Sequence, residues 1–257
     1  MLYMPYDEIC DVITEKLTKR GCSEQDARRV AEVATTNSLE GVYSHGINRV
    51  RRMLLGIDNG LIDPKAHAQK AGGLGGFERW DGHQALGVLS ALACTDRAIE
   101  LAKEHGIGCV ALNNTNHWLR GGTYGWRIAR AGMVGMAFTN TKSNMAYYGT
   151  RESLLGTVPL IIALPREKGP VVVDVSMAEF SYGKLELARL KGQELPVPGG
   201  YTTEGELSTD PWEVMKGNRV LPMSKWKGSG LAMILDLAAA TMSLGNTSCL
   251  LYTSRCV

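Results

Sequence analysis

Residues 40–49, Glu-Gly-Val-Tyr-Ser-His-Gly-Ile-Asn-Arg, place a hydroxyl, an imidazole and a guanidinium within six positions. The imidazole of His45 has an ordinary pKa of about 6.5, which suits proton transfer near neutral pH. Arg49 carries a planar group that binds a carboxylate through two parallel hydrogen bonds. If Gly46 opens a helix, His45 lies at its N-terminal end and Arg49 about one turn further on. The segment therefore predicts acid–base chemistry on a carboxylate-bearing substrate such as a 2-oxo acid.

Helical elements are expected to position this segment. Apolar residues at helical spacing predict one helix that stops at Gly21 and a second that begins after Ser23 and runs toward Ser38. Ser23 and Asp26 have the spacing of a capping box, which marks the start of the second helix. A third helix is predicted to end near residues 59–60. We therefore expect residues 1–66 to form a helical N-terminal unit.

Residues 67–245 are expected to form a mixed α/β region. The apolar patterns predict strands over 77–80, 108–112, 134–138, 159–165 and 171–175, and helices over 87–104, 124–131, 179–190 and 230–244. The glycine-rich run 72–76 does not satisfy G-x-G-x-x-G and precedes a strand, so we interpret it as a flexible loop. The sequence also lacks G-x-x-x-x-G-K-[ST], so no generic nucleotide motif is present.

Composition excludes several functional classes. The 257 residues are enough for one large or two modest domains, and the net charge of +2 gives no indication of a nucleic-acid partner. The first residues lack the pattern of a secretory signal, and no apolar run reaches the roughly 18 residues of a membrane span. The six cysteines are scattered, which disfavours a disulfide framework or a zinc site and favours a reduced, cytoplasmic setting.

Four longer segments resemble the type-2 malate/L-lactate dehydrogenase family, which binds nicotinamide cofactors on a non-Rossmann fold. They are residues 43–49, 116–126, 180–183 and 221–230. The resemblance extends from about Tyr6 to about Gly245. It implies an α/β fold, with the helical N-terminal unit followed by a mixed-sheet, non-Rossmann cofactor domain, and it implies a homodimer. The tryptophan-rich second and fourth segments most resemble family members that reduce 2,3-diketo-L-gulonate, a 2-oxo acid, with NADH or, alternatively, NADPH.

The resemblance also implies roles for individual residues. His45 corresponds to the proton donor, Ser44 to its hydrogen-bonding neighbour, and Arg49 to the residue that binds the substrate carboxylate. His117 corresponds to a position that lines the same pocket, and Asp174 is expected to orient His45. The residues implied in cofactor binding are Val171, Val172, Val173, Asp174, Val175, Ser176, Trp226 and Lys227. Val158 departs from the family, which usually has Asn before this proline, so one wall of the pocket lacks an amide.

Other interpretations of these residues stay open. His45 is alternatively a structural cap partner, Asp174 a turn residue, and Trp118 and Trp126 members of a core. A neighbouring substrate of the same family, such as malate, lactate, sulfolactate, ureidoglycolate or a cyclic imino acid, is the main functional alternative. A non-catalytic fragment is the second. A Ser44–His45 hydrolase is disfavoured because adjacent residues rarely present both groups to each other and no G-x-S-x-G motif exists. His67 and His83 are expected to be solvated, and His105 is expected to be a C-terminal residue of a helix, where the helix dipole favours it.

The last twelve residues differ from the rest of the chain. Residues 246–257 contain two of the six cysteines, have no helical periodicity and match nothing expected at this place in the family. We expect a truncated reading frame with a non-native tail. Loss of the segment that family members have here is expected to expose apolar faces of the N-terminal helices and to weaken the cofactor site.

Overall fold

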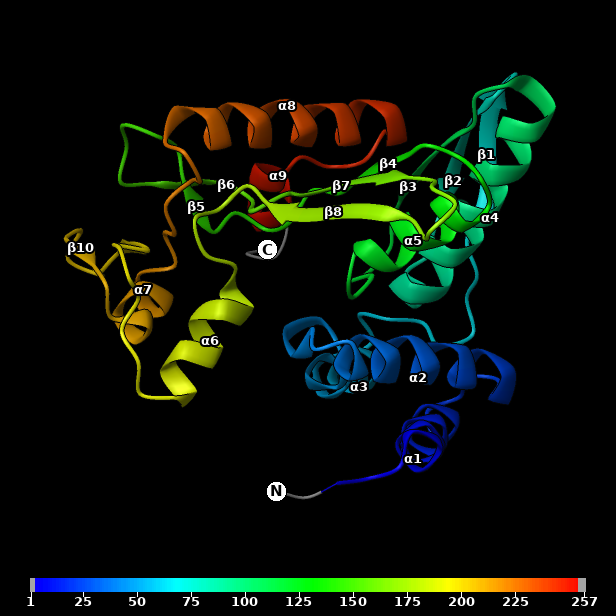
Figure 1. The fold of residues 1–257 in the computed structure, drawn as a ribbon, viewed down its shortest axis with the longest axis horizontal. Coiled ribbons are helices and arrows are strands. Elements are labelled where there is room, and N and C mark those ends of the chain that lie inside the picture. The colour runs from blue at the N-terminus through cyan, green and yellow to red at the C-terminus, as the bar shows by residue number, and fades with distance from the viewer. Residues whose placement is uncertain (1–2, 254–257) are drawn as a thin grey trace. The chain divides into compact units, whose positions relative to one another are not determined.

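The computed structural model describes residues 3–253, with side chains up to residue 250. The chain divides into two compact units (Figure 1). The first contains the described residues up to Gly135 together with Ala163–Val171, and the second contains Met136–Ile162 and the described residues from Val172 on. The helical segment 1–66 thus shares its unit with the residues that follow it up to Gly135.

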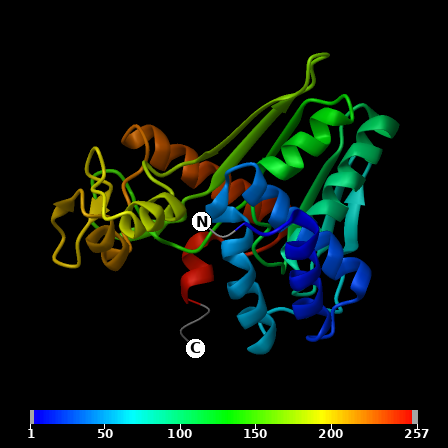
Figure 2. The same cartoon turned by 60° about the horizontal axis from the view of Figure 1, so that its bottom comes forward.

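The first unit begins with helices that pack on one another, as the blue segments of Figure 2 show. Their apolar faces bury Ile13, Leu17 and Val30 in one core cluster. The hydroxyl of Ser23 accepts a hydrogen bond from the Asp26 backbone at 3.2 Å, so the predicted start of the second helix is confirmed. The elements are α1 Tyr6–Thr18, α2 Glu24–Leu39, the 3₁₀ turns η1 Tyr43–His45 and η2 Ile47–Arg49, and α3 Val50–Asp58.

A three-stranded sheet with two helices completes the first unit. The strand order is β1-β2-β3, in which β1 and β2 are antiparallel and β2 and β3 are parallel. Because parallel neighbours need a crossover, a helix connects β2 to β3. The elements are β1 Gln69–Leu74, β2 Phe77–Asp81, α4 Gly87–His105, β3 Cys109–Asn113 and α5 Gly122–Arg130.

The flexible loop predicted over residues 72–76 is wrong in part. Gly72 and Gly73 belong to β1, where they pair with Arg79 and Glu78 of β2. A Cβ on Gly73 would lie 2.3 Å from the Phe77 carbonyl oxygen, so the close approach of the two strands requires glycine there. Only the turn between the strands remains of the predicted loop. Glycines hide the strand pattern because they contribute no alternating side chains.

The second unit contains short strands, most of a three-stranded sheet of order β4-β7-β8, and four helices among the described residues. Its core holds Met145, Met177, Leu185 and Val220. The strands are β4 Gly135–Phe138, β5 Met145–Ala146, β6 Ser153–Leu155, β7 Pro159–Leu164, β8 Val171–Ser176, β9 Gly200–Tyr201 and β10 Leu207–Ser208. The helices are α6 Tyr182–Leu190, α7 Pro211–Gly217, α8 Trp226–Ser243 and α9 Ser248–Thr253.

Two helix boundaries in this unit differ from the expectation, and two helices, α7 and α9, were not predicted. Helix α6 begins at Tyr182 rather than at residue 179, because the Ser181 hydroxyl caps it by accepting from the Lys184 backbone at 3.3 Å. Helix α8 begins at Trp226 instead of Gly230. Helix α9 lies in the segment that shows no helical periodicity in the sequence.

Helix α9 is attached to α8 by a buried polar contact. The carboxylate of Asp236, which is 5% exposed, accepts the Ser248 backbone N–H at 3.0 Å and the Ser248 hydroxyl at 3.0 Å. Residues 254–257 of the expected tail lie outside the described residues. Among the residues described, no helix has the length and apolarity to cross a membrane, and no group of three or more His, Cys, Asp or Glu side chains could hold a metal ion.

The expected fold class is confirmed. The sheet of the first unit mixes antiparallel and parallel pairs and has three strands, which differs from the long parallel sheet of a Rossmann domain. A helical N-terminal part precedes these mixed sheets, as predicted.

Candidate active site

Two 3₁₀ turns on either side of Gly46 build the segment that carries Ser44, His45 and Arg49. A Cβ on Gly46 would lie 2.2 Å from the Ser38 hydroxyl and 2.9 Å from the Ala34 carbonyl oxygen, so the segment can pass α2 this closely only with glycine. The expectation that Gly46 opens a helix is confirmed in part: Gly46 is the N-cap of the 3₁₀ turn η2, and the α-helix α3 begins only at Val50, with Arg49 as its N-cap.

His45 is held by its own neighbour. The Ser44 hydroxyl lies 2.8 Å from His45 Nδ1, as the family resemblance implied, although adjacent residues rarely present both groups to each other. The 3₁₀ turn accounts for this contact, since it folds the chain more tightly than an α-helix. Among the described residues no hydrogen-bond partner is found for Nε2, so Nε2 is the ring nitrogen open to a ligand. In a hydrolytic triad the second nitrogen binds a carboxylate, and the Ser44–His45 contact alone does not reproduce that arrangement.

His117 lies beside His45 although it comes from the loop between β3 and α5. The two rings stack with centroids 5.7 Å apart and an interplanar angle of 21°. His117 Nδ1 accepts the Leu119 backbone N–H at 3.0 Å. That bond occupies the lone pair of Nδ1 and leaves the proton of the neutral ring on Nε2. The structure thus brings together the two histidines that the sequence singled out.

Burial and cationic neighbours keep both imidazoles neutral. Burial, and then the charge of Arg49, lower the pKa of His45 to about 4. The pKa of His117 is also lowered, first by loss of surrounding water and then by the charges of His45, Arg49 and Arg52. His117 is exposed, and the hydrogen bond that its Nδ1 accepts from the Leu119 backbone also favours the neutral ring. Both rings are therefore uncharged at neutral pH in the free protein.

Arg49 is fixed by the backbone of the same segment. Its Nε donates a hydrogen bond to the Ser44 carbonyl oxygen at 2.6 Å, which orients the plane of the guanidinium. A guanidinium has five N–H donors, so this bond does not exhaust its capacity to bind a carboxylate. Arg49 and His45 are thus held on one short segment, one as a cation and the other as a neutral proton carrier.

Two residues that sequence reasoning missed join the histidine segments. Asn37, in the last turn of α2 and 1% exposed, donates from Nδ2 to the His45 carbonyl oxygen at 3.0 Å. The Thr123 hydroxyl, in the first turn of α5, donates to Asn37 Oδ1 at 3.0 Å. An ion pair between Arg120 and Glu40 joins the same two segments. A buried amide near the end of an otherwise apolar helix face was the available signal, but it belongs to no recognised motif.

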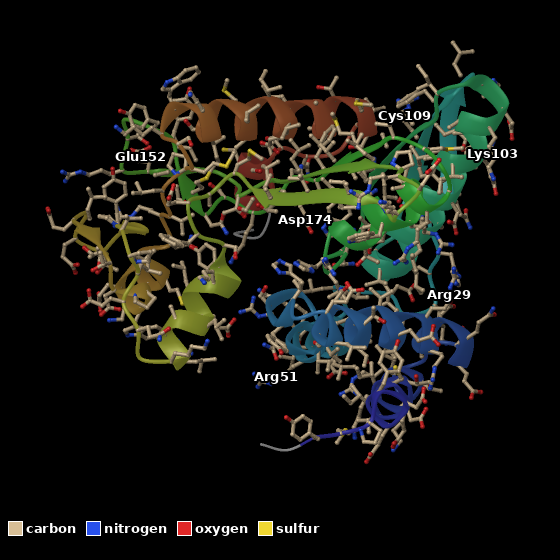
Figure 3. All side chains as sticks on the ribbon, in the orientation of Figure 1. Arg29, Arg51, Lys103, Cys109, Glu152 and Asp174 are labelled. Atoms are coloured by element: carbon tan, nitrogen blue, oxygen red, sulfur yellow. The ribbon has the colours of Figure 1, made fainter. Side chains whose placement is uncertain are left out.

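The residues expected to bind the cofactor lie in β8 and at the start of α8. Asp174 is exposed in the middle of β8 (Figure 3). The chain after β8 pairs with the segment before α8, because Met177 accepts the Met223 backbone N–H at 2.9 Å. The two predicted cofactor segments are therefore neighbours, which the sequence alone did not show.

The chemistry of these two segments fits a nicotinamide dinucleotide. Trp226 is 64% exposed in the first turn of α8, and Lys227 beside it is exposed as well. An N-terminal helix turn and an ammonium favour phosphate oxygens, while an exposed indole offers a flat apolar surface for a ring. The exposed Val173 and Val175 add apolar surface on β8.

The remaining candidates have structural roles. Trp118 stacks on Tyr124 with centroids 5.2 Å apart and packs against the core of the first unit, whereas Trp126 lies under Arg130 in a cation–π contact. Val158 is fully buried with a φ of 20°, which is unusual for a β-branched residue and tolerated better by Asn. The other three histidines are exposed: His67 and His83 as predicted, and His105 as the last residue of α4, the helix-end position predicted for it.

Comparisons with known proteins identify the family of the chain. A family profile described as malate/L-lactate dehydrogenase matches residues 4–254, which extends past the end point expected near Gly245. The 2,3-diketo-L-gulonate reductase of Citrobacter koseri is 45% identical over 241 residues, covering 93% of this chain and 72% of the relative. That of Klebsiella pneumoniae is 44% identical over 243 residues, covering 94% of this chain and 73% of the relative.

Solved structures show the same fold. Malate dehydrogenase from Pyrococcus horikoshii superposes with a TM-score of 0.87 at 29% identity, covering 96% of this chain and 70% of that one. Δ1-Piperideine-2-carboxylate reductase from Pseudomonas syringae superposes with a TM-score of 0.90 at 26% identity, covering 96% of this chain and 75% of that one. With a family profile spanning nearly the whole sequence and relatives near 45% identity, the chain belongs to the malate/L-lactate dehydrogenase family of oxidoreductases.

Proposed function

We propose that this protein reduces 2,3-diketo-L-gulonate to 3-dehydro-L-gulonate with NADH, NADPH being the alternative cofactor. The observation that carries the proposal is the set of Ser44, His45, Arg49 and His117 in one place, in a chain 45% identical to a reductase of that name. A neutral imidazole beside a fixed guanidinium suits a substrate that carries a ketone next to a carboxylate. Related 2-oxo acids, as in the malate and lactate dehydrogenases of the family, are the alternative substrates.

Arg49 binds and orients the substrate. Its guanidinium, fixed through Nε on the Ser44 carbonyl oxygen, offers further N–H donors to the carboxylate. A carboxylate on Arg49 places the adjacent ketone near His45, which is on the same segment. Binding of the carboxylate is equally strong in the ground state and in the transition state, so it lowers the Michaelis constant and fixes the position of the reacting carbon.

His45 supplies the proton from Nε2. The substrate carboxylate offsets the charge of Arg49, one of the two causes that lower the pKa of His45, so binding raises that pKa and promotes protonation. When bound, the reduced nicotinamide supplies the hydride that reaches the carbonyl carbon. As negative charge develops on the ketone oxygen, His45 gives it the Nε2 proton, and the Ser44 hydroxyl holds Nδ1 in place. Hydride plus proton convert the ketone to an alcohol.

The cofactor is proposed to lie against Val171, Val172, Val173, Asp174, Val175 and Ser176 of β8 and against Trp226 and Lys227. The exposed indole and the ammonium at the start of α8 support this assignment. Asp174 remains a proposed orienting residue for His45 on the strength of the family resemblance. A homodimer in the cytoplasm is proposed on the same basis, and size-exclusion chromatography tests the dimer.

Steady-state kinetics with a panel of 2-oxo acids tests the proposal, with loss of NADH or NADPH absorbance as the signal. We expect His45→Ala to lower kcat by roughly 100-fold or more while NADH binding persists. Arg49→Lys is expected to raise KM by roughly tenfold or more, because a point charge cannot replace the bidentate group. His67→Ala, which alters an exposed histidine of the same unit, is the matched control.

Two results would contradict the proposal. Turnover of His45→Ala within severalfold of the parent would remove the proton-donor assignment. Failure of the parent to bind NADH or NADPH in a fluorescence titration would favour the non-catalytic alternative. Faster reduction of malate- or lactate-type oxo acids than of diketogulonate would keep the mechanism and change the substrate.

A further inference from the structure

The relative position of the two histidines depends on residues behind them. We propose that Asn37 and Thr123 form a buried bridge that holds His45 against His117, and that both are positioning residues for the reductase reaction. This inference rests on the proposed function for its kinetic consequences, whereas its structural part can be measured without turnover.

Asn37 holds the backbone of His45 directly. Its Nδ2 donates to the His45 carbonyl oxygen at 3.0 Å, and its own backbone carbonyl accepts the Val42 N–H at 2.9 Å. The next side chain of α2 acts similarly, since the Ser38 hydroxyl accepts the Ile47 N–H at 3.0 Å. The end of α2 therefore binds the turn on both sides of Gly46. Because Asn37 is 1% exposed, water cannot easily replace its hydrogen bonds.

Thr123 connects the same amide to the His117 segment. Its hydroxyl donates to Asn37 Oδ1 at 3.0 Å from the first turn of α5. The loop that carries His117 leads directly into this helix. One amide thus uses its nitrogen on the His45 segment and its oxygen on the His117 segment. Such an arrangement fixes the distance between two pieces of chain that are remote in sequence.

The alternative link between the segments is weaker. Glu40 and Arg120 form an ion pair, but the side chain of Glu40 is 46% exposed, so water and salt screen it. A buried hydrogen bond between neutral groups is not screened in this way. We therefore assign the alignment of the two rings to the bridge rather than to the ion pair.

The consequence for the reaction is geometric. The ring centroids are 5.7 Å apart, and a shift of about 1 Å in a catalytic group can cost about 100-fold in rate. Asn37→Ala removes both hydrogen bonds, and we expect kcat to fall by roughly 10- to 100-fold. KM should change less, because Arg49 is held by the Ser44 carbonyl oxygen and not by Asn37. Thr123→Val removes one bond and is expected to lower kcat by roughly three- to tenfold.

The test compares Asn37→Ala, Thr123→Val and the conservative Thr123→Ser, which keeps a hydroxyl donor. Thr95→Val is the matched control, because it removes a buried threonine hydroxyl of the same unit that bonds only the Ala91 carbonyl oxygen of its own helix. For each variant, kcat and KM are measured, and the titration midpoints of the His45 and His117 rings are recorded by NMR. In the first two variants we expect both midpoints to move toward the ordinary histidine value of about 6.5. Thr123→Ser and Thr95→Val should match the parent.

Unchanged midpoints and unchanged kcat in Asn37→Ala and Thr123→Val would overturn the bridge. Equal losses in Thr123→Val and Thr123→Ser would also overturn it, because the hydroxyl would then have no special role. If Asn37→Ala does not fold, the comparison of the two Thr123 variants decides. If the parent shows no reductase activity, the proposed function fails, and the NMR midpoints still confirm or refute the bridge.

Discussion

The neutral state of His45 predicts a specific loss of stability in mild acid. Burial and Arg49 lower its pKa to about 4, whereas in the unfolded chain it returns to about 6.5. Between these values the unfolded state binds more protons than the folded state, so the free energy of unfolding falls as the pH falls. His45→Asn removes the titrating group, keeps a polar side chain and should abolish this part of the pH dependence.

The size of the effect follows from the two pKa values. At about pH 4.5 a group with these pKa values lowers the free energy of unfolding by about 2.5 kcal/mol relative to neutral pH. Because His45 is only half-buried, solvent screening reduces the effect, and we expect a decrease in the free energy of unfolding of about 1–2.5 kcal/mol, with the unscreened value as the upper limit. That range is a substantial fraction of the stability of an ordinary domain.

The pH window separates His45 from the main buried carboxylate of the same unit. Glu78 is 2% exposed, and Arg97, followed by Lys70 and Trp80, lowers its pKa to about 2. The stability that Glu78 contributes is present above its unfolded pKa of about 4.5 and is lost as the pH falls toward 2. Unfolding measured between about pH 7 and about pH 4.5 therefore reports mainly on His45 and on His117, whose pKa is lowered as well, and much less on Glu78.

Urea unfolding of the parent, His45→Asn and the exposed control His67→Asn at the two pH values is the assay. The quantity compared is the change in free energy between the two pH values, so any direct cost of a substitution cancels. We expect His45→Asn to lose about 1–2.5 kcal/mol less than the parent on acidification, and His67→Asn to behave like the parent. If the free energy of unfolding falls equally in the parent and in His45→Asn on acidification, the assignment of a neutral His45 with a lowered pKa is refuted.

Two further predictions concern packing. Gly46→Ala places a Cβ 2.2 Å from the Ser38 hydroxyl and 2.9 Å from the Ala34 carbonyl oxygen. We therefore expect the free energy of unfolding, measured with heat or urea, to fall by about 1–3 kcal/mol, and kcat to fall as well. A Tm equal to that of the parent would show that the turn can move away from α2 at no cost. Ser248→Ala removes one of the hydrogen bonds to the buried Asp236 carboxylate and should destabilise the attachment of α9 by about 1–2 kcal/mol. The expected signal is faster amide hydrogen exchange in residues 248–253. Unchanged exchange would mean that Asp236 does not hold this helix.

The elements that the sequence predicted well are those with long apolar patterns. Helices α1 to α5 each repeat an apolar face, and their predicted places agree with the structure. Strand β1 was missed because Gly72 and Gly73 have no side chains to alternate. Strands β5, β9 and β10 have only two residues each, too short for a period to show. Helix α7 carried a readable signal, since Asp210 caps it and Pro211 occupies the first turn, but no apolar period accompanied it.

Some residues of the candidate site could be predicted from the sequence and others could not. Ser44, His45, Arg49 and His117 were predicted because their side-chain chemistry, spacing and family resemblance were visible in the sequence. The Ser44–His45 contact was implied by the same resemblance, whereas the 3₁₀ turn that carries it and the close fit of Gly46 against α2 were not visible in the sequence. Asn37 was not predicted either, because a buried amide acquires meaning only from partners that the fold brings to it.

The electrostatics of the site couple the proton to the substrate. Arg49 is needed to bind a carboxylate, yet its charge adds to burial in lowering the pKa of His45, so His45 is unprotonated in the free site. A bound carboxylate offsets that charge and makes protonation of His45 more favourable at the moment when a proton donor is needed. The same cation therefore selects the substrate and prevents His45 from carrying a proton in its absence. This arrangement requires His45 and Arg49 to stay close, which explains why both belong to one short segment held at three points, by the Ser44 carbonyl oxygen, Asn37 and Ser38.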